Sequence, residues 1–367
     1  MASEFNGFPI LKGVPTPYLT LSTSAIATRA RSVGRGIPNC SAYYAVKAND
    51  FAGIIGLLAP LDIGFEVATL AELDAVLGLG VPPWRVITGS PVKTVELIEG
   101  AFRRGVRQFA FDCTDEVDKL AAIAPGCDVV IRINVPNDAS DWPLSGKFGA
   151  DDADVLPLMT YARDRGLNPA GTTFHVGSQC NSPASWAKAL EKCSGFWKAA
   201  AEVGIQFSVL NMGGGYPSRY LTDVPPVEAI ESVIADGVRK WYPKGIRTQI
   251  EPGRYLVGDA GTFVTRCVAR AVRDGKDWLF LDVGVFNGLM EAVAGIRYRF
   301  SVPEGGPVKT WSIGGPSCDG FDVVDKNVEL PEPTVGGLVL IHTAGAYTSV
   351  YASNFNGFPI PRIVMVP

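Results

Sequence analysis

Hydrophobic positions in the first two-thirds of the chain alternate between two repeating patterns. Short runs rich in β-branched and aromatic residues predict buried strands at 42–46, 63–67, 85–88, 108–111, 129–134, 172–176, 207–212 and 248–251. Segments with helical periodicity lie between most of them and predict helices at 70–79, 94–104, 116–123, 151–165, 184–203 and 227–241. Strict alternation of strand and helix predicts βαβ units and a parallel sheet.

Eight predicted strands are the number that closes a (β/α)8 barrel of the TIM type. A doubly wound open sheet is the alternative, but no GxGxxG motif joins a first strand to its helix. We therefore expect an α/β fold with a (β/α)8 barrel over residues 22–255.

The pattern changes after about residue 251. The apolar runs at 263–269, 278–283, 338–341 and 363–366 are separated by turn-rich stretches, without a long amphipathic helix. This pattern predicts a mostly antiparallel β domain, sandwich-like or barrel-like, over 256–367. Residues 17–21 resemble a further strand, so we assign 1–21 to the same domain. The hexapeptide FNGFPI occurs at 5–10 and again at 355–360, which is too short to indicate a repeat architecture.

Composition and charge exclude several classes of function. The 367 residues include 33 Lys and Arg and 37 Asp and Glu. Without an excess of basic residues, we do not expect the chain to bind nucleic acid. The two histidines, His175 and His342, are too far apart to form a zinc-type motif, and we expect no metal. Seven scattered cysteines without a CxxC pair indicate reduced thiols in the cytoplasm. Without a signal-like apolar region or a membrane-spanning stretch, we expect a soluble protein.

Candidate chemistry gathers where the predicted barrel strands end, because active residues of such barrels come from the C-terminal ends of the strands. Lys47 follows the first strand, and a lysine there is either solvated or, when desolvated, a Schiff-base amine. The run Gly213, Gly214 and Gly215 follows another strand and is either a flexible turn or a close approach to phosphate.

Three further residues at these ends favour one cofactor. Glu251 could be the carboxylate that keeps a pyridinium nitrogen protonated. The planar guanidinium of Arg254 could bind two phosphate oxygens at once. His175 is either a core histidine or a ring that stacks on a flat aromatic group. Each signal is weak alone, but together they predict pyridoxal 5'-phosphate as the cofactor.

Six motifs then carry a family resemblance. AVKAN, HVGSQ, GGGYP, EPGRY, GPSCDGFD and GAYT occur in the order typical of the ornithine, lysine and diaminopimelate decarboxylases of the alanine-racemase-like fold (fold type III). The resemblance covers nearly the whole chain, from about Pro17 onward. GPSCDGFD is similar to the ornithine/lysine branch, and the shortened stretch 282–291 is similar to its bacterial members.

The resemblance implies roles for individual residues. Lys47 would hold the cofactor covalently, His175 would stack on its ring, and Glu251 would pair with the ring nitrogen. The remaining implied cofactor-binding residues are Glu66 and Arg132 near the ring, and Ser178, Gly213, Gly214, Gly215, Gly253, Arg254 and Tyr347 at the phosphate. The implied substrate-binding residues are Asp319, Glu291 and Phe355.

The resemblance also implies a homodimer with shared active sites. Cys318 and Asp319 would reach into the other subunit's site, where Cys318 would help to protonate the product and Asp319 would bind the distal ammonium of the substrate. Lys147 would pair with Asp322 across the interface. One departure concerns the cofactor site, because the family usually has Asp before its glycine run and this chain has Asn211.

The implied activity is decarboxylation of a basic L-amino acid, ornithine or lysine, to putrescine or cadaverine and CO2, as in polyamine biosynthesis. The alternatives are a racemase, or a decarboxylase for a different or modified amino acid. A further alternative is a non-catalytic homologue that binds a partner, which the presence of Lys47 and Arg254 disfavours. One methylene separates ornithine from lysine and is worth only about 1–3 kcal/mol in a pocket, so the choice between them stays open.

Overall fold

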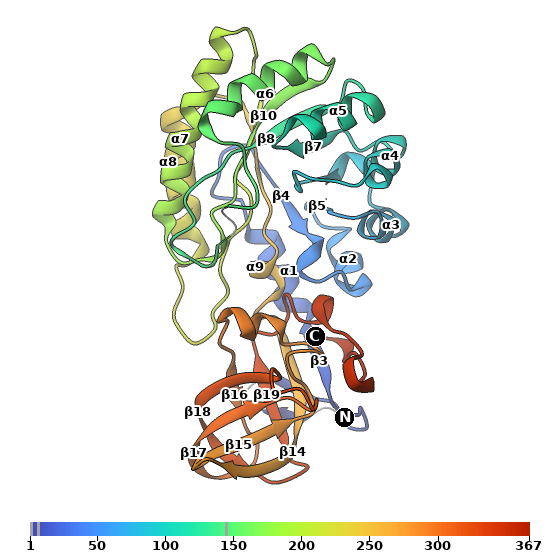
Figure 1. Ribbon diagram of the computed structural model, residues 1–367, viewed down its shortest axis with the longest axis vertical. Coiled ribbons are helices and arrows are strands. Elements are labelled where there is room, and N and C mark those ends of the chain that lie inside the picture. The colour runs from blue at the N-terminus through green and yellow to red at the C-terminus, as the bar shows by residue number, and fades with distance from the viewer. Residues whose placement is uncertain (1–2, 6–7, 144–145) are drawn as a thin grey trace. The chain divides into compact units, whose positions relative to one another are not determined.

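The computed structural model describes residues 3–5, 8–143 and 146–367 (Figure 1). The chain divides into two compact units. We call Arg29–Pro217 with Val224–Gly253 the barrel unit. The β unit holds the described residues up to Thr28, together with Ser218–Asp223 and Arg254–Pro367.

Eight parallel strands form the barrel unit. Their spatial order is β6 (Val86–Ile87), β5 (Gly64–Glu66), β4 (Cys40–Ala45), β13 (Arg247–Ile250), β12 (Val209–Asn211), β10 (Asn168–Thr173), β8 (Asp128–Arg132) and β7 (Gln108–Phe111). A parallel bridge between Thr88 and Phe109 joins the first strand of this order to the last. The sheet therefore nearly closes, which confirms the predicted barrel and excludes the open doubly wound sheet.

Helices surround these strands, as Figure 1 shows. They are α2 (Ala52–Leu58), α3 (Leu70–Gly78), α4 (Val95–Arg103), α5 (Thr114–Ile123), α6 (Asp152–Asp164), α7 (Pro183–Glu202) and α8 (Val227–Trp241), preceded by α1 (Thr23–Ser32). Six of them lie where the periodicity predicts helices, whereas α1 and α2 were not predicted. Local capping explains several boundaries: the hydroxyls of Thr69 and Thr94 accept the N–H groups of Glu72 and Leu97 at the starts of α3 and α4.

One strand differs from its prediction in a way that matters for the site. The sequence pattern predicts a strand at 172–176, but β10 ends at Thr173. Gly177 has a φ of +93°, a left-handed conformation that suits glycine, so the chain turns away from the sheet just beyond His175. His175 therefore lies on the loop after the strand.

A mixed, mostly antiparallel sheet forms the β unit. Its order is β16 (Arg299–Ser301), β19 (Leu338–His342), β14 (Gly261–Arg273), β15 (Lys276–Leu281), β17 (Gly305–Gly314) and β18 (Val323–Pro333). β3 (Tyr18–Ser22) pairs with β14 and, in parallel, with β20 (Arg362–Val366). The N-terminal strand thus joins the C-terminal sheet, as the sequence predicts.

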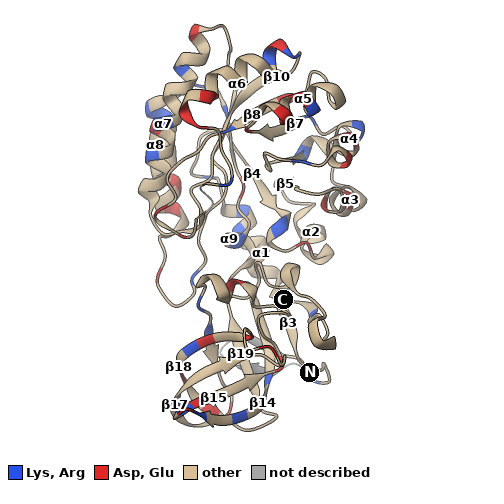
Figure 2. Cartoon of the chain, viewed as in Figure 1, with Lys and Arg blue, Asp and Glu red and all other residues tan. Residues whose placement is uncertain are grey.

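Short elements complete the chain. They are the strands β1 (Ser3–Phe5), β2 (Phe8–Ile10), β9 (Ser140–Trp142) and β11 (Ser178–Cys180), helix α9 (Arg254–Val257), and the 3-10 turns η1 (Val46–Ala48), η2 (Pro83–Arg85), η3 (Met290–Ala294), η4 (Ser349–Tyr351) and η5 (Phe355–Gly357). Figure 2 shows both charge signs on the outer helices of the barrel unit. Within the described ranges, no helix is long and apolar enough to cross a membrane.

Candidate active site

The C-terminal ends of the barrel strands carry the predicted site residues. Lys47 lies in η1, directly after β4, and Glu66 is the last residue of β5. Arg132 ends β8, His175 follows β10 by two residues, and Glu251 follows β13 directly. Because these strands are parallel and neighbours in one barrel, the five side chains belong to the same end of the barrel unit.

Lys47 forms an ion pair with Glu66 at this end. Its Nζ donates to Oε2 of Glu66, whose other oxygen accepts the N–H of Gly89 at 3.2 Å. The Glu66 side chain is 1% exposed, whereas that of Lys47 is 44% exposed. The pair therefore has a buried carboxylate and an amine that is still accessible for chemistry.

Glu251 is a buried carboxylate held by Asn211. Asn211 donates its Nδ2 to Oε1 of Glu251 at 2.6 Å, and its own side-chain oxygen accepts the N–H of Gly213 at 2.9 Å. Burial and the charge of Glu66 raise the pKa of Glu251 to about 7, while Lys47 and Asn211 oppose the shift. An Asp at position 211 would bring a second negative charge, so the Asn of this chain favours a charged Glu251.

His175 provides a neutral ring. Its Nδ1 accepts the N–H of Gly177 at 3.0 Å, so a proton on the ring belongs on Nε2. Desolvation and the positive charges of Arg132 and Lys47 hold the pKa of His175 well below its usual value. A ring fixed in its neutral form is suited to stacking on a flat aromatic group.

The glycine run after β12 leaves no room for side chains. A Cβ on Gly213 would lie 2.1 Å from the carbonyl oxygen of Phe174, and one on Gly215 would lie 2.6 Å from that of Gly177. Both glycines have left-handed φ values, +62° and +102°. The loop backbone is therefore packed against the loop that carries His175 and leads to Ser178, the half-buried first residue of β11.

These residues fit the cofactor that the sequence predicts. An accessible amine on Lys47 matches an aldehyde, a buried carboxylate on Glu251 matches a cationic ring nitrogen, and the neutral ring of His175 matches a flat ring. The glycine run presents backbone without side chains, which suits a phosphate. The donor set in the barrel unit therefore fits pyridoxal phosphate.

The β unit holds Arg254 in a second buried cluster. Its two terminal nitrogens donate to the two oxygens of Glu291, each at 2.6 Å, and Nη1 also donates to the hydroxyl of Tyr220 at 2.6 Å. The guanidinium carbon lies 4.7 Å from the centre of the Tyr347 ring. Tyr347 has a φ of +54°, a strained conformation of the kind that clusters at functional sites.

Glu291 is thus placed as the partner of Arg254. Both side chains are 3% exposed, and their bidentate geometry uses both oxygens of the carboxylate. The predicted roles of Glu291 in substrate binding and of Arg254 at the phosphate stay predictions.

Cys318 and Asp319 lie on exposed turns of the β unit. The Cys318 Sγ lies 3.3 Å from the side-chain oxygen of Asn356, and Asp319 accepts the N–H of Phe321 at 2.8 Å. Phe355 is 39% exposed, and the centre of its ring lies 4.5 Å from that of Phe286.

Asp322 and Lys147 have different surroundings. Asp322 is buried and accepts the N–H groups of Val285 at 2.7 Å and Ser317 at 3.0 Å. Lys147 is exposed, with its Nζ 4.9 Å from the centre of the Phe148 ring. Their predicted pairing across a dimer interface stays a prediction. His342 has a structural contact instead, since its Nε2 lies 2.7 Å from the Ser301 hydroxyl, and burial lowers its pKa to about 4.

Sequence reasoning missed Gly89 and the loop that follows it. A Cβ on Gly89 would lie 2.8 Å and 2.9 Å from the two carboxylate oxygens of Glu251. The signal was available, because Gly89 directly follows the predicted strand at 85–88 and active residues come from strand ends.

Residues 23–258 match a family model described as pyridoxal-dependent decarboxylase, pyridoxal binding domain. This match covers more than half of the chain and the whole of the barrel unit. The chain belongs to the pyridoxal-dependent decarboxylase family. The resemblance carried by the six motifs is confirmed, and so is pyridoxal 5'-phosphate as the cofactor.

Characterised members of this family are similar along nearly the whole chain. The lysine/ornithine decarboxylase of Selenomonas ruminantium is 34% identical over 364 residues, which cover 97% of this chain and 91% of the relative. A solved structure of lysine decarboxylase from the same bacterium has a TM-score of 0.89 at 34% identity, covering 96% of this chain and 93% of that one. The lysine/ornithine decarboxylase of Vibrio vulnificus, solved with putrescine, is 28% identical with a TM-score of 0.89, covering 97% and 95%.

Proposed function

We propose that this pyridoxal phosphate-dependent decarboxylase acts on the basic L-amino acids ornithine and lysine and releases putrescine or cadaverine and CO2. The pairing of an accessible Lys47 with the buried Glu66, beside a Glu251 held by Asn211, is the observation that carries the pyridoxal phosphate chemistry. The relatives from Selenomonas ruminantium and Vibrio vulnificus, named for these two substrates, support the choice of a basic amino acid.

Pyridoxal phosphate, when bound, supplies an electron sink that stabilises negative charge at Cα after CO2 leaves. The chain's own residues make that chemistry possible. Lys47 offers its Nζ as the covalent anchor and as a donor and acceptor of protons. Glu66 holds that nitrogen in position through Oε2 and, being buried, keeps a single orientation.

Glu251 would pair with the ring nitrogen of the cofactor and so control its charge. Burial raises the pKa of Glu251 to about 7. A cationic ring nitrogen beside the carboxylate would lower this pKa and favour the charged form. Asn211 supports that charged form through its N–H donation at 2.6 Å. His175 contributes a neutral face and no charge, because its pKa lies well below neutrality.

A substrate panel tests the proposal. CO2 release is measured from L-ornithine, L-lysine, L-arginine and diaminopimelate, with the Lys47→Ala variant as the blank. Release from ornithine or lysine with the highest kcat/KM supports the proposal. Preference for another amino acid, or return of the opposite enantiomer without CO2, contradicts it and identifies a different decarboxylase or a racemase.

We also propose a homodimer in which Cys318 and Asp319 of one subunit complete the active site of the other. Cys318 is exposed, and Asp319 uses one side-chain oxygen on the backbone of its own turn. The aromatic residues Phe321 and Phe355 beside them are 54% and 39% exposed, as expected of a surface that another subunit covers.

Subunit mixing tests this arrangement. Lys47→Ala and Asp319→Ala variants are each inactive alone in this proposal, but a mixed dimer contains one intact site. Equal mixing then restores about a quarter of the parent activity, because half of the dimers are mixed and half of their sites are intact. Activity that stays at background after subunit exchange, verified by mass, contradicts shared sites.

The cytoplasm is the compartment that we propose. All seven cysteines lie among the described residues and are free thiols. Reduced thiols are typical of cytosolic proteins. Fractionation of the source cells tests the location, and recovery outside the cytoplasmic fraction contradicts it.

A further inference from the structure

The loop between β6 and α4 lies against both carboxylates of the cofactor site. The N–H of Gly89 donates to Oε1 of Glu66 at 3.2 Å. A Cβ at this position would lie 2.8 Å from Oε1 of Glu251 and 2.9 Å from Cγ of Glu66. The loop backbone therefore lies close enough to set the space that Glu66 and Glu251 occupy.

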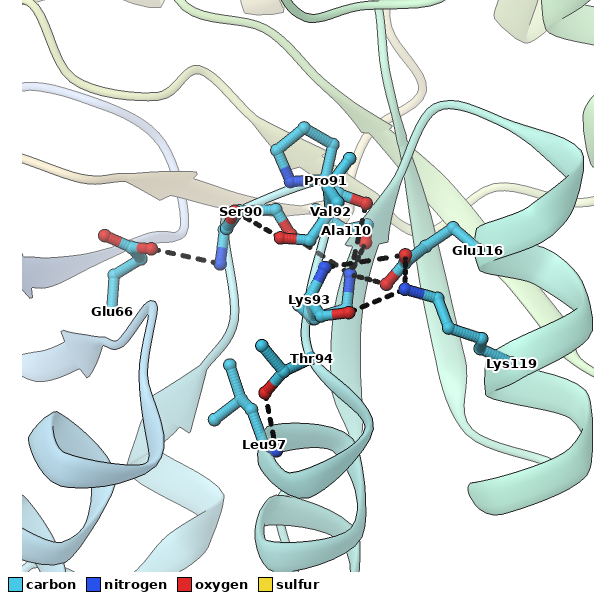
Figure 3. A network of polar contacts seen from close by, with 11 residues as sticks. Glu66, Ser90, Pro91, Val92, Lys93, Thr94, Leu97, Ala110, Glu116 and Lys119 are labelled. Carbon is cyan, nitrogen blue, oxygen red and sulfur yellow. Dashed lines mark hydrogen bonds and ion pairs between the residues drawn. The ribbon is translucent and has the colours of Figure 1, made fainter.

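A buried lysine holds this loop. The side chain of Lys93 has no exposed surface, and its Nζ donates to the carbonyl oxygens of Ser90 at 3.1 Å and Pro91 at 3.3 Å (Figure 3). The same nitrogen donates to the carbonyl oxygen of Ala110 on β7. One ammonium group thus ties two residues of the loop to the next strand of the barrel.

Glu116 on α5 supplies the opposite charge. Its Oε1 lies 2.7 Å from Nζ of Lys93, and its Oε2 lies 2.6 Å from Nζ of Lys119. Lys119 also donates to the backbone carbonyl oxygen of Lys93 at 2.6 Å. Figure 3 shows the resulting network, which reaches from Glu66 through the loop to α5.

A fully buried ion pair is poorly explained by stability alone. Desolvation lowers the pKa of Lys93, and the charge of Glu116 opposes that shift. Well-packed apolar side chains of similar volume often stabilise a protein as much as a buried ion pair does. Directional donors to Ser90, Pro91 and Ala110 supply something that apolar side chains cannot, namely a defined position for the loop backbone.

We infer that Lys93, held by Glu116, is a positioning residue that fixes the Gly89–Pro91 loop and thereby the orientation of Glu66 and Glu251 in the cofactor site. The inference rests on the proposed function only in taking Lys47, Glu66 and Glu251 as the groups that contact pyridoxal phosphate. Lys93 itself contacts loop carbonyls and Glu116 and acts through the loop.

The main test replaces the ion pair with apolar side chains, in the double variant Lys93→Met and Glu116→Met. This variant avoids a lone buried charge, so we expect it to fold. In the cofactor-free protein, we expect hydrogen exchange of residues 86–94 to be about tenfold faster, the effect of losing roughly one charge-assisted hydrogen bond. In the loaded protein, we expect the pH titration of the visible absorbance of bound pyridoxal phosphate to shift.

A matched control separates positioning from general destabilisation. Tyr242→Phe removes a buried hydrogen bond of 2.8 Å from the Tyr242 hydroxyl to Leu190 of α7, away from the loop. We expect it to lower thermal stability without changing the absorbance titration or the exchange of residues 86–94. If the double variant shows the parent titration and the parent exchange, or if the control shows the same shifts, the inference is wrong.

A second variant changes the end of the loop that contacts Glu66 and Glu251. Gly89→Ala leaves Lys93 and Glu116 intact but presses a methyl group on Glu66 and Glu251. We expect the pH titration of the absorbance of bound pyridoxal phosphate to shift, while the amide hydrogen exchange of Lys93 stays unchanged. An unchanged titration in this variant contradicts control of the carboxylates by the loop. If the parent chain itself develops no absorbance with pyridoxal phosphate, the proposed function fails, whereas the exchange result on cofactor-free protein still decides the inference.

Discussion

Two lysine–glutamate pairs in the barrel unit are made of the same groups and have opposite surroundings. Lys47 pairs with Glu66, and Lys93 pairs with Glu116; both glutamates are 1% exposed. The Lys47 side chain is 44% exposed, whereas that of Lys93 is 0% exposed. Burial of the ammonium, and not of the carboxylate, distinguishes the two pairs.

The difference fits the two roles that we propose, in which Lys47 takes part in the chemistry and Lys93 positions the loop. Lys93 is surrounded by the carbonyl oxygens of Ser90, Pro91 and Ala110, so its donors are used on the protein itself. Lys47 remains accessible from one side, which a covalent anchor requires. The Lys93–Glu116 pair in turn positions the loop that contains Gly89, and the N–H of Gly89 donates to Glu66, the partner of Lys47.

Removing the accessible amine has the largest expected effect. We expect Lys47→Ala to reduce CO2 release to background, because it removes the amine that serves as the covalent anchor. Thermal stability is expected to fall as well, because Glu66, which is 1% exposed, loses its cationic partner. CO2 release and the visible absorbance after addition of pyridoxal phosphate measure the outcome. CO2 release at the parent rate with intact cofactor would contradict the role of Lys47.

Removing Lys93 from its buried pair with Glu116 is expected mainly to lower the free energy of unfolding. Lys93→Met leaves Glu116 buried, and loss of one partner of a buried pair costs about 3–5 kcal/mol. We expect the lower end of that range, since Lys119 still pairs with Glu116 at 2.6 Å. Urea unfolding measures the loss. The double variant with Glu116→Met recovers most of it, and failure to recover would mean that the carbonyl contacts, more than the charge, stabilise this region.

The buried carboxylate of Glu251 makes the stability of the folded chain depend on pH. The pKa of Glu251 is about 7 in the folded chain, against an ordinary value of 4.5, so the folded state binds the proton more tightly. The free energy of unfolding of the cofactor-free protein therefore falls as the pH rises from 4.5 to about 7. Urea unfolding across this range measures the slope.

Asn211→Asp sharpens that pH dependence. The substitution removes the N–H donor of Glu251 and adds a negative charge at 2.6 Å, so the pKa of Glu251 rises further and the decline in stability extends to higher pH. Asn211→Ser, which is uncharged, serves as the control. An identical pH profile for Asn211→Asp and Asn211→Ser would show that charge at this position is unimportant.

The smallest effect is expected at the outer member of the network. Lys119 is 30% exposed, and Lys93 still pairs with Glu116 when Lys119 is removed, so we expect Lys119→Met to cost less than Lys93→Met. We expect little change in urea unfolding and none in the absorbance titration of bound pyridoxal phosphate. An effect as large as that of Lys93→Met would assign the positioning role to Lys119 instead.

Hydrophobic periodicity predicted the barrel unit well and the β unit less well. Helix α8 (Val227–Trp241) lies where the pattern places it, and each of the eight barrel strands overlaps a predicted strand. β17 (Gly305–Gly314) and β18 (Val323–Pro333) were not predicted, because a sheet with one solvated face carries polar residues such as Lys309 and Glu329 at many positions.

The duplicated hexapeptide shows the limit of local sequence. In the first copy, Phe5 ends β1 and Phe8–Ile10 form β2, which pair in antiparallel register. In the second copy, Phe355–Gly357 form the 3-10 turn η5. Phe5 therefore lies in a strand and Phe355 in a 3-10 turn, although the two hexapeptides are identical in sequence, because weak local preference does not decide the conformation.

The sequence by itself determined the alternation of strands and helices, and with it the gathering of Lys47, Glu66, Arg132, His175 and Glu251 at one end of a barrel. It singled out Lys47, which directly follows its predicted strand, but it gave no role to Lys93, which lies five residues after the strand predicted at 85–88. Only the tertiary structure decided which ammonium is enclosed. Burial depends on residues that are distant in sequence, here Ala110 on β7 and Glu116 on α5, and no local pattern encodes those contacts.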